Sequence, residues 1–193
     1  MPAPLLYGSA MILGIVAPAA ETALEMARVN AMDRTAFVAT FGGVFENSPW
    51  VAAGAFPSAP FASPSALHAA MMGVVRAAPE ADRLRLLNAH PELAGKEARA
   101  KAMTDHSVAE QGSAGLDRMS EADFARFDRL NAAYREKFGF PFIIAVRGRS
   151  RAEIVSEFER RLANPPAVEM EADIEQVGLI TRMRLERRLG PFE

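Results

Sequence analysis

Only one run of this chain has the pattern of a β-strand, and this constrains the fold more than any other feature. The run is Phe142–Val146, and a single strand without a partner cannot form a sheet. We therefore expect it to be a buried extended connector. Elsewhere apolar residues recur at helical spacing, as Phe37, Phe41, Val44 and Phe45 do. The chain is predicted to be all-α, a single compact domain of about seven to nine helices.

Start signals divide this domain into helices. Ser63 before a proline and Ser120 before an amphipathic run are typical N-caps. Ser150 with Glu153 predicts a capping box. Residues 48–64 are rich in proline, glycine, alanine and aromatic residues, so we expect an irregular segment there.

The N-terminal stretch differs from the rest of the chain. Its first twenty residues carry no charge, but Pro4 and Pro18 interrupt them and no basic residue precedes them. This pattern favours neither a membrane span nor a signal peptide. We expect residues 1–31 to be an extension that is weakly ordered or follows a misplaced start codon. Residues 32–193 would form the domain, and the predicted location is the cytoplasm.

Composition excludes several classes of function. The 22 basic and 24 acidic residues give a net charge of -2, so there is no electrostatic footprint for nucleic acid. The chain has no cysteine, which excludes disulfides, thiolate metal sites and cysteine nucleophiles. A three-histidine zinc site would need His68, His90 and His106, whose spacing is not typical of one. We expect no metal and no cofactor.

Two segments could carry chemistry at helix ends. His90 precedes Pro91 where a helix must end, and an imidazole there suits proton transfer. The alternative is that it caps the helix carbonyls as a cation. Ser107 and Glu110 have the spacing of a capping box, and a helix start of this kind can also bind a polar or anionic ligand.

Two further features are unusual for a scaffold. Arg184 falls between Val177 and Ile180 on the apolar arc of the last predicted helix, so its guanidinium needs a carboxylate, carbonyls or an anionic ligand. An internal salt bridge is the simpler alternative. The connector around Phe142 either fills the core or offers its main-chain groups to a planar ligand.

Together these motifs resemble one family, the decarboxylases of 2-oxo-4-hydroxy-4-carboxy-5-ureidoimidazoline (OHCU). The resemblance spans about residues 33–189 and rests on the segments FVATFGGVFENSPWVA, HPELAGKEA, SVAEQGSAGLD, FDRLNAAYREKFGFPFIIAVRGRS and EFERRLANP. It implies an all-helical, cofactor-free homodimer of urate breakdown. Such an enzyme converts OHCU, the product of 5-hydroxyisourate hydrolase, into (S)-allantoin and carbon dioxide.

The resemblance also implies a set of site residues. The catalytic residues would be His90, Glu110 and Arg184. Glu110 would orient His90, and Arg184 would receive a substrate anion. The expected substrate contacts are Pro91, Ser107, Glu110, Gln111, Phe140, Phe142, Ile143 and Ile144.

The expected partners are the substrate and a second copy of the chain, with functional coupling to the hydrolase and with neither nucleic acid nor membrane. Two alternatives stay open. One is a non-catalytic helical ligand-binding or interaction module derived from the family. The other is a different cofactor-free lyase or hydrolase that acts on a ureido compound.

Overall fold

The computed structural model describes residues 24–95, 103–116 and 118–192, and within these ranges the regular secondary structure is helical without a strand. The helices are α1 (Met26–Asn30), α2 (Arg34–Phe41), α3 (Pro49–Ala55), the 3-10 helix η1 (Phe56–Ser58), α4 (Pro64–Ala77), α5 (Glu80–Asn88), α7 (Asp105–Ser113), α8 (Glu121–Phe138), α9 (Arg151–Arg161) and α10 (Pro166–Leu189). The all-α prediction is confirmed, and the nine α-helices of the described ranges fall within the expected number.

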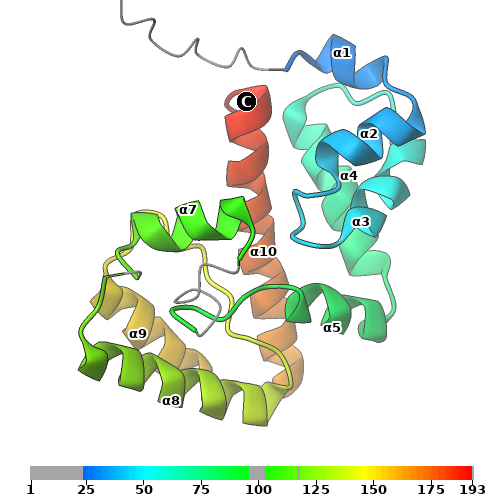
Figure 1. Ribbon diagram of the computed structural model, residues 1–193. Coiled ribbons are helices and arrows are strands. Elements are labelled where there is room, and N and C mark those ends of the chain that lie inside the picture. Colours follow the sequence, from blue (N-terminus) through cyan, green and yellow to red (C-terminus); the bar gives the residue numbers. More distant parts are fainter. Residues whose placement is uncertain (1–23, 96–102, 117, 193) are drawn as a thin grey trace, which may run out of the picture.

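Helix α10 is the central element of the fold (Figure 1). Helices α1–α5 lie on one side of it and α7–α9 on the other, with direct packing against α4 and α8. Helices on both sides cover the apolar residues of α10. The buried ones include Ile174, Val177, Ile180 and Leu185. A helix that is apolar over much of its circumference must be covered on several sides.

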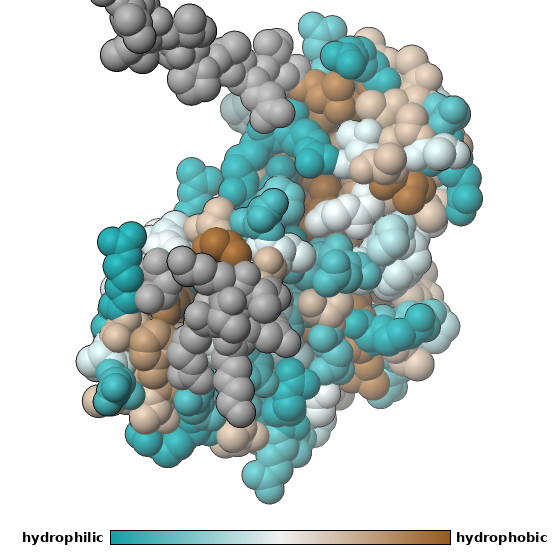
Figure 2. Space-filling model, in the orientation of Figure 1, coloured by the Kyte–Doolittle hydropathy of each residue, from teal (hydrophilic) through white to brown (hydrophobic). Residues whose placement is uncertain are grey.

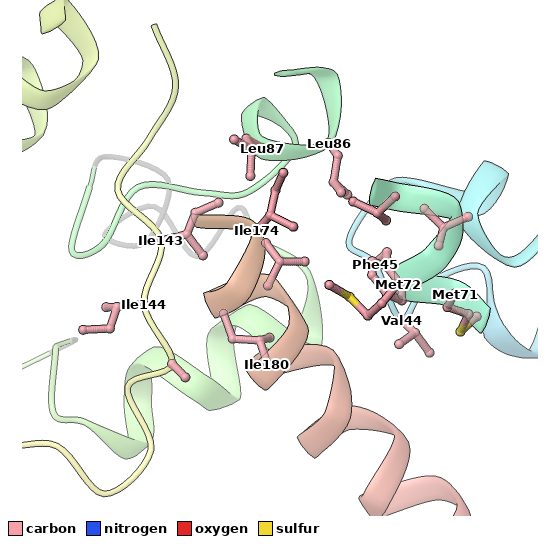
Figure 3. Packing of buried hydrophobic residues seen from close by; sticks show 14 of the residues in the cluster. Val44, Phe45, Met71, Met72, Leu86, Leu87, Ile143, Ile144, Ile174 and Ile180 are labelled. Atoms are coloured by element: carbon pink, nitrogen blue, oxygen red, sulfur yellow. The ribbon is translucent and has the colours of Figure 1, made fainter. Parts of the chain in front are cut away.

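The extended connector forms as predicted. Gly139 ends α8 with a φ of 79°, a left-handed conformation that favours glycine. Every residue of 140–146 is buried, and none belongs to a helix or strand. Figure 3 shows Ile143 of this connector pointing toward Ile174 of α10, while Ile144 points to the other side of the connector. The connector therefore brings main-chain groups that no helix has consumed into the interior.

Local signals placed most helix starts correctly. Ser63 and Ser120 accept hydrogen bonds as N-caps, and Ser150 with Glu153 forms the predicted capping box. The expectation of an irregular segment over residues 48–64 is wrong in its first half, which forms α3 and η1. Pro49 occupies the first helical position, where its missing N–H costs nothing.

The final part of the predicted extension lies against the domain. The main-chain N–H of Leu24 donates to the Arg188 carbonyl at 2.9 Å. The Asn30 side chain makes two hydrogen bonds with the main chain of Phe61, and Val29 is buried. Residues 24–31 are thus structurally part of the helical domain. The rest of the extension, residues 1–23, lies outside the described residues.

The exterior of the protein is mainly polar on the face that Figure 2 shows. On the face shown in Figure 2, apolar residues appear as separate spots among polar ones. In the described part of the chain, the helices lack the combination of length and hydropathy that a membrane crossing needs.

Candidate functional site

A cavity of about 250 Å³ lies between α7, the connector, α10 and the turn after α5. We call it the site cavity. Its volume suits a ligand of about one ring with small substituents. Its lining combines apolar residues with a few ionisable ones: His90, Pro91, Leu93, Ser107, Ala109, Glu110, Gln111, Ser113, Phe142, Ile143, Ile144, Val146, Arg147, Ile180, Met183, Arg184 and Arg187.

His90 presents one ring nitrogen without a partner. The residue comes just after α5 and is only 6% exposed, and its Nδ1 lies 2.9 Å from the Leu86 carbonyl. A carbonyl only accepts, so Nδ1 carries the proton and Nε2 keeps a lone pair. The buried Nε2 makes no hydrogen bond within the described ranges. A buried acceptor left open in this way is unusual in a folded protein.

The electrostatic environment keeps the imidazole neutral. Burial lowers the pKa of His90 below its usual value, and Arg184 acts in the same direction against the opposing charge of Glu46. The lowered pKa favours the neutral ring over the alternative of a cationic helix cap, although the ring does bond to a helix carbonyl. A neutral imidazole with a free lone pair can act as a general base.

Arg184 uses all five of its N–H groups within the protein. Nε and Nη2 donate to the two oxygens of Glu110 at 2.8 and 2.7 Å. Nη1 donates to Glu46 at 2.7 Å and to the Val44 carbonyl at 3.1 Å. The second hydrogen of Nη2 reaches Ser107 Oγ at 3.5 Å. The internal salt bridge considered from the sequence is therefore present.

Glu46 does not line the site cavity but binds Arg184, and the sequence analysis missed it. It is 3% exposed, has a φ of 49°, and accepts hydrogen bonds from Thr104 at 2.6 Å and Ser107 at 2.9 Å. Burial acts to raise its pKa, but Arg184 and the hydrogen bond from Thr104 outweigh burial and hold the pKa below the usual value. A glutamate beside the apolar pair Val44–Phe45 was the signal that could have identified it.

Glu110 pairs with arginines and not with His90. Besides Arg184, it accepts a hydrogen bond from Arg187 at 3.2 Å, and the described structure shows no hydrogen bond between Glu110 and the imidazole. The capping-box alternative is also wrong, because Thr104 is the N-cap of α7 and accepts from the Ser107 N–H. Ser107 and Glu110 therefore lie inside the helix with their side chains available to the cavity.

Gln111 shapes the loop that carries His90. Its Oε1 accepts from the Ala94 N–H at 2.9 Å, and its Nε2 donates to the Glu92 carbonyl at 3.3 Å. Ala94 has a φ of 52°, which is uncommon for a residue with a side chain. The amide of Gln111 thus holds residues 92–94 in a specific conformation next to Pro91.

The structure brings nearly all of the predicted site residues to one cavity. His90, Glu110 and Arg184 line it together with Pro91, Ser107, Gln111, Phe142, Ile143 and Ile144. Phe140 is the exception. It is absent from the lining and packs in the core against Tyr134 and Phe138, because the buried end of α8 closes over it before the connector reaches the cavity.

Two cations at the cavity were not predicted. Arg147 and Arg187 line it, and Arg147 makes no ion pair with any residue that the structure describes. No group of three histidine, aspartate or glutamate side chains in the described ranges could hold a metal ion. The site cavity is thus lined by an imidazole, one carboxylate and three arginines beside an apolar wall.

Comparison with known proteins gives one consistent result. The family model for OHCU decarboxylase matches residues 30–186. A 2-oxo-4-hydroxy-4-carboxy-5-ureidoimidazoline decarboxylase of Haloferax volcanii is 41% identical over 86% of this chain and 97% of that protein. A uric acid degradation bifunctional protein of Bacillus subtilis is 37% identical over 81% of this chain, which spans only 31% of that protein.

A solved structure agrees with these matches. The crystal structure of an (S)-allantoin synthase superposes with a TM-score of 0.69 at 28% identity. The superposition covers 86% of this chain and 54% of that chain, so this chain spans about half of that solved protein.

Proposed function

This chain belongs to the OHCU decarboxylase family, and from that premise we propose that it converts OHCU to (S)-allantoin and carbon dioxide. The observation that carries this proposal is the neutral His90, whose unpartnered Nε2 lies in a cavity that Glu110 and Arg184 also line. Convergence of the three groups on one cavity favours an enzyme over a non-catalytic module, which would not need them together.

The reaction needs little beyond proton transfer and charge stabilisation. The bond from the ring carbon to the carboxylate breaks, and its electron pair forms a double bond to the adjoining ring carbon that bears the ureido group. The π pair of the carbon–nitrogen double bond at that carbon moves to the ring nitrogen. Carbon dioxide leaves, the hydroxyl on the reacting carbon becomes a carbonyl, and the ring carbon that bears the ureido group gains a proton. The ring nitrogen that receives the electron pair takes its proton from water. The ring itself therefore serves as the electron sink.

His90 can perform both proton steps. Its free Nε2 accepts the hydroxyl proton as the carboxylate leaves, and the resulting imidazolium returns that proton to one face of the ring carbon. The Leu86 carbonyl holds Nδ1–H and so fixes the direction of Nε2. Delivery from one fixed direction would make the product one-handed.

We assign Glu110 and Arg184 roles that differ from those expected. Arg184 has no N–H group left for a substrate anion, so it positions Glu110 through two parallel hydrogen bonds. Glu110 then accepts hydrogen bonds from the ring or ureido N–H groups. The leaving carboxylate is received by Arg147 or Arg187, the two cations of the cavity that are exposed to solvent.

We also propose the partners and the compartment that the family resemblance implies. The chain would form a homodimer and act in the cytoplasm. Its substrate would come from a 5-hydroxyisourate hydrolase. The similarity to a bifunctional protein of uric acid degradation supports this coupling. Supplying OHCU directly would be useful because the compound is unstable.

The direct test of the function measures the handedness of the product. OHCU is generated freshly, the purified protein is added, and circular dichroism records allantoin as it forms. We expect faster loss of OHCU than in buffer and an excess of the (S) enantiomer. Decay at the buffer rate to racemic allantoin would show that the proposed function is wrong.

The fall of kcat/KM at low pH should reflect the protonation of His90. The pKa of His90 is lowered, so the neutral base is present at neutral pH and is lost only as the pH falls through that lowered value. We expect kcat/KM to stay level from about pH 8 to about pH 6.5, the ordinary histidine pKa, and to fall below it. A profile that rises on acidification would contradict a neutral Nε2 as the acceptor.

A further inference from the structure

A second group of buried charges lies behind the wall of the site cavity, and neither the sequence analysis nor the proposed reaction uses it. Arg161 at the end of α9 is 1% exposed, and Glu169 and Asp173 on α10 are each 0% exposed. Arg161 donates to Glu169 at 2.7 Å and to Asp173 at 2.6 Å. We call these three residues, with Tyr134, which donates to Glu169, the buried charge cluster.

The cluster holds both main-chain groups of one connector residue. The Ile143 N–H donates to Asp173 Oδ1 at 3.0 Å, and the Ile143 carbonyl accepts from Arg161 Nη1 at 2.8 Å. Two residues further on, the Ala145 N–H donates to Gln176 Oε1 at 3.1 Å. Alternate residues of the connector are therefore tied to α9 and α10.

This arrangement determines where the neighbouring main-chain groups point. In a trans peptide the carbonyl of one residue and the N–H of the next point in opposite directions, and the connector bonds are trans. With the Ile143 groups facing the cluster, the Phe142 carbonyl and the Ile144 N–H must face away from it. Phe142 and Ile144 line the site cavity, and these two groups have no hydrogen-bond partner among the residues described.

Arg161 also fixes a ring of the cavity wall. Its guanidinium lies 4.7 Å from the centre of the Phe142 ring, which stacks on Phe158 at 3.9 Å between centres. One buried cation therefore holds the main chain of Ile143 and the side chain of Phe142.

Stability alone gives a poor reason for such a cluster, since buried ion pairs are often no more stabilising than apolar residues of similar size. We propose that Arg161 and Asp173 are positioning residues, which hold the connector so that the Phe142 carbonyl and the Ile144 N–H are presented to the ligand. An acceptor and a donor together suit the N–H and carbonyl groups of a cyclic urea. This inference rests on the proposed function for its choice of ligand.

The test compares variants of Asp173 with a variant in the same cluster that leaves the connector untouched. Asp173→Ala removes the acceptor for the Ile143 N–H, whereas Asp173→Asn keeps an acceptor oxygen. Burial raises the pKa of Asp173 to about 7, against the opposing effect of Arg161. Tyr134→Phe loses the hydroxyl contacts with Glu169 and Asp173 but keeps the ring.

With freshly generated OHCU, we expect Asp173→Ala to raise KM by about tenfold, the equivalent of one lost hydrogen bond, with kcat nearly unchanged. Asp173→Asn should recover most of this loss, and Tyr134→Phe should keep the KM of the original protein. A purely structural role would lower the amount of folded enzyme without moving KM. An unchanged KM in Asp173→Ala, or an equal rise in Tyr134→Phe, would overturn the proposal.

Amide hydrogen exchange tests the positioning role independently of the proposed function, because it does not require turnover of OHCU. Asp173→Ala should speed exchange at Ile143 without speeding it at the core of α8, whether or not the protein turns over OHCU. Equal exchange at Ile143 in both proteins would refute the positioning role even if decarboxylation is observed. Should Asp173→Ala fail to fold, Gln176→Ala tests the same connector through Ala145, and there an unchanged KM counts against the proposal.

Discussion

Replacing His90 with glutamine is expected to lower kcat by about 10²–10⁴-fold, the usual contribution of a positioned acid or base. Glutamine can still donate to the Leu86 carbonyl, but it cannot exchange a proton with the substrate. The fold should persist, which circular dichroism and thermal unfolding would check. His90→Ala should lose similar activity but also the hydrogen bond to Leu86.

His68 provides the matched control for this experiment. It is a partly buried histidine that also has a lowered pKa, and it contacts Thr181 outside the cavity lining. His68→Gln should therefore retain kcat. Near-normal turnover by His90→Gln would show that the assigned proton transfer is wrong.

Replacing Arg184 with methionine should be the most destabilising change in the site. The substitution leaves the Glu46 carboxylate, whose side chain is 1% exposed, without its cation. Breaking a buried pair from one side typically costs about 3–5 kcal/mol. Activity should also be lost, because Glu110 is no longer held by two parallel hydrogen bonds. Chemical denaturation of the variant measures the first effect and turnover of OHCU the second.

Two further variants make this prediction specific. Glu46→Gln combined with Arg184→Met removes both charges of the pair, so the double variant should be more stable than Arg184→Met alone. Arg187→Met removes an arginine of the same helix that is 47% exposed in its side chain, and it should change the free energy of unfolding very little. If the double variant is no more stable than Arg184→Met, the charge of Glu46 is not the reason that the single change is costly.

Much of the site could be anticipated because a charged residue among apolar residues at helical spacing indicates a buried charge. Arg184 lies on an apolar arc, which indicates a buried guanidinium. Arg161 shows the same pattern, since Ile154 and Phe158 precede it at helical spacing on α9. The motif around His90 and Pro91 indicated the helix end correctly. Phe140 was misplaced because a run of aromatic residues does not reveal where the core ends and a cavity begins.

Most of the helices, the caps at Ser63, Ser120 and Ser150, and the extended character of residues 142–146 can be derived from the sequence alone, because they depend on neighbours within about one or two helical turns. Which partners the buried charges meet was decided only by tertiary structure. Burial requires a counter-charge for Arg184, but only the folded chain brings Glu46 to it across 138 positions. The same holds for the burial that lowers the pKa of His90 and for the hydrogen bonds that hold Ile143, since both arise only when the helices pack around α10.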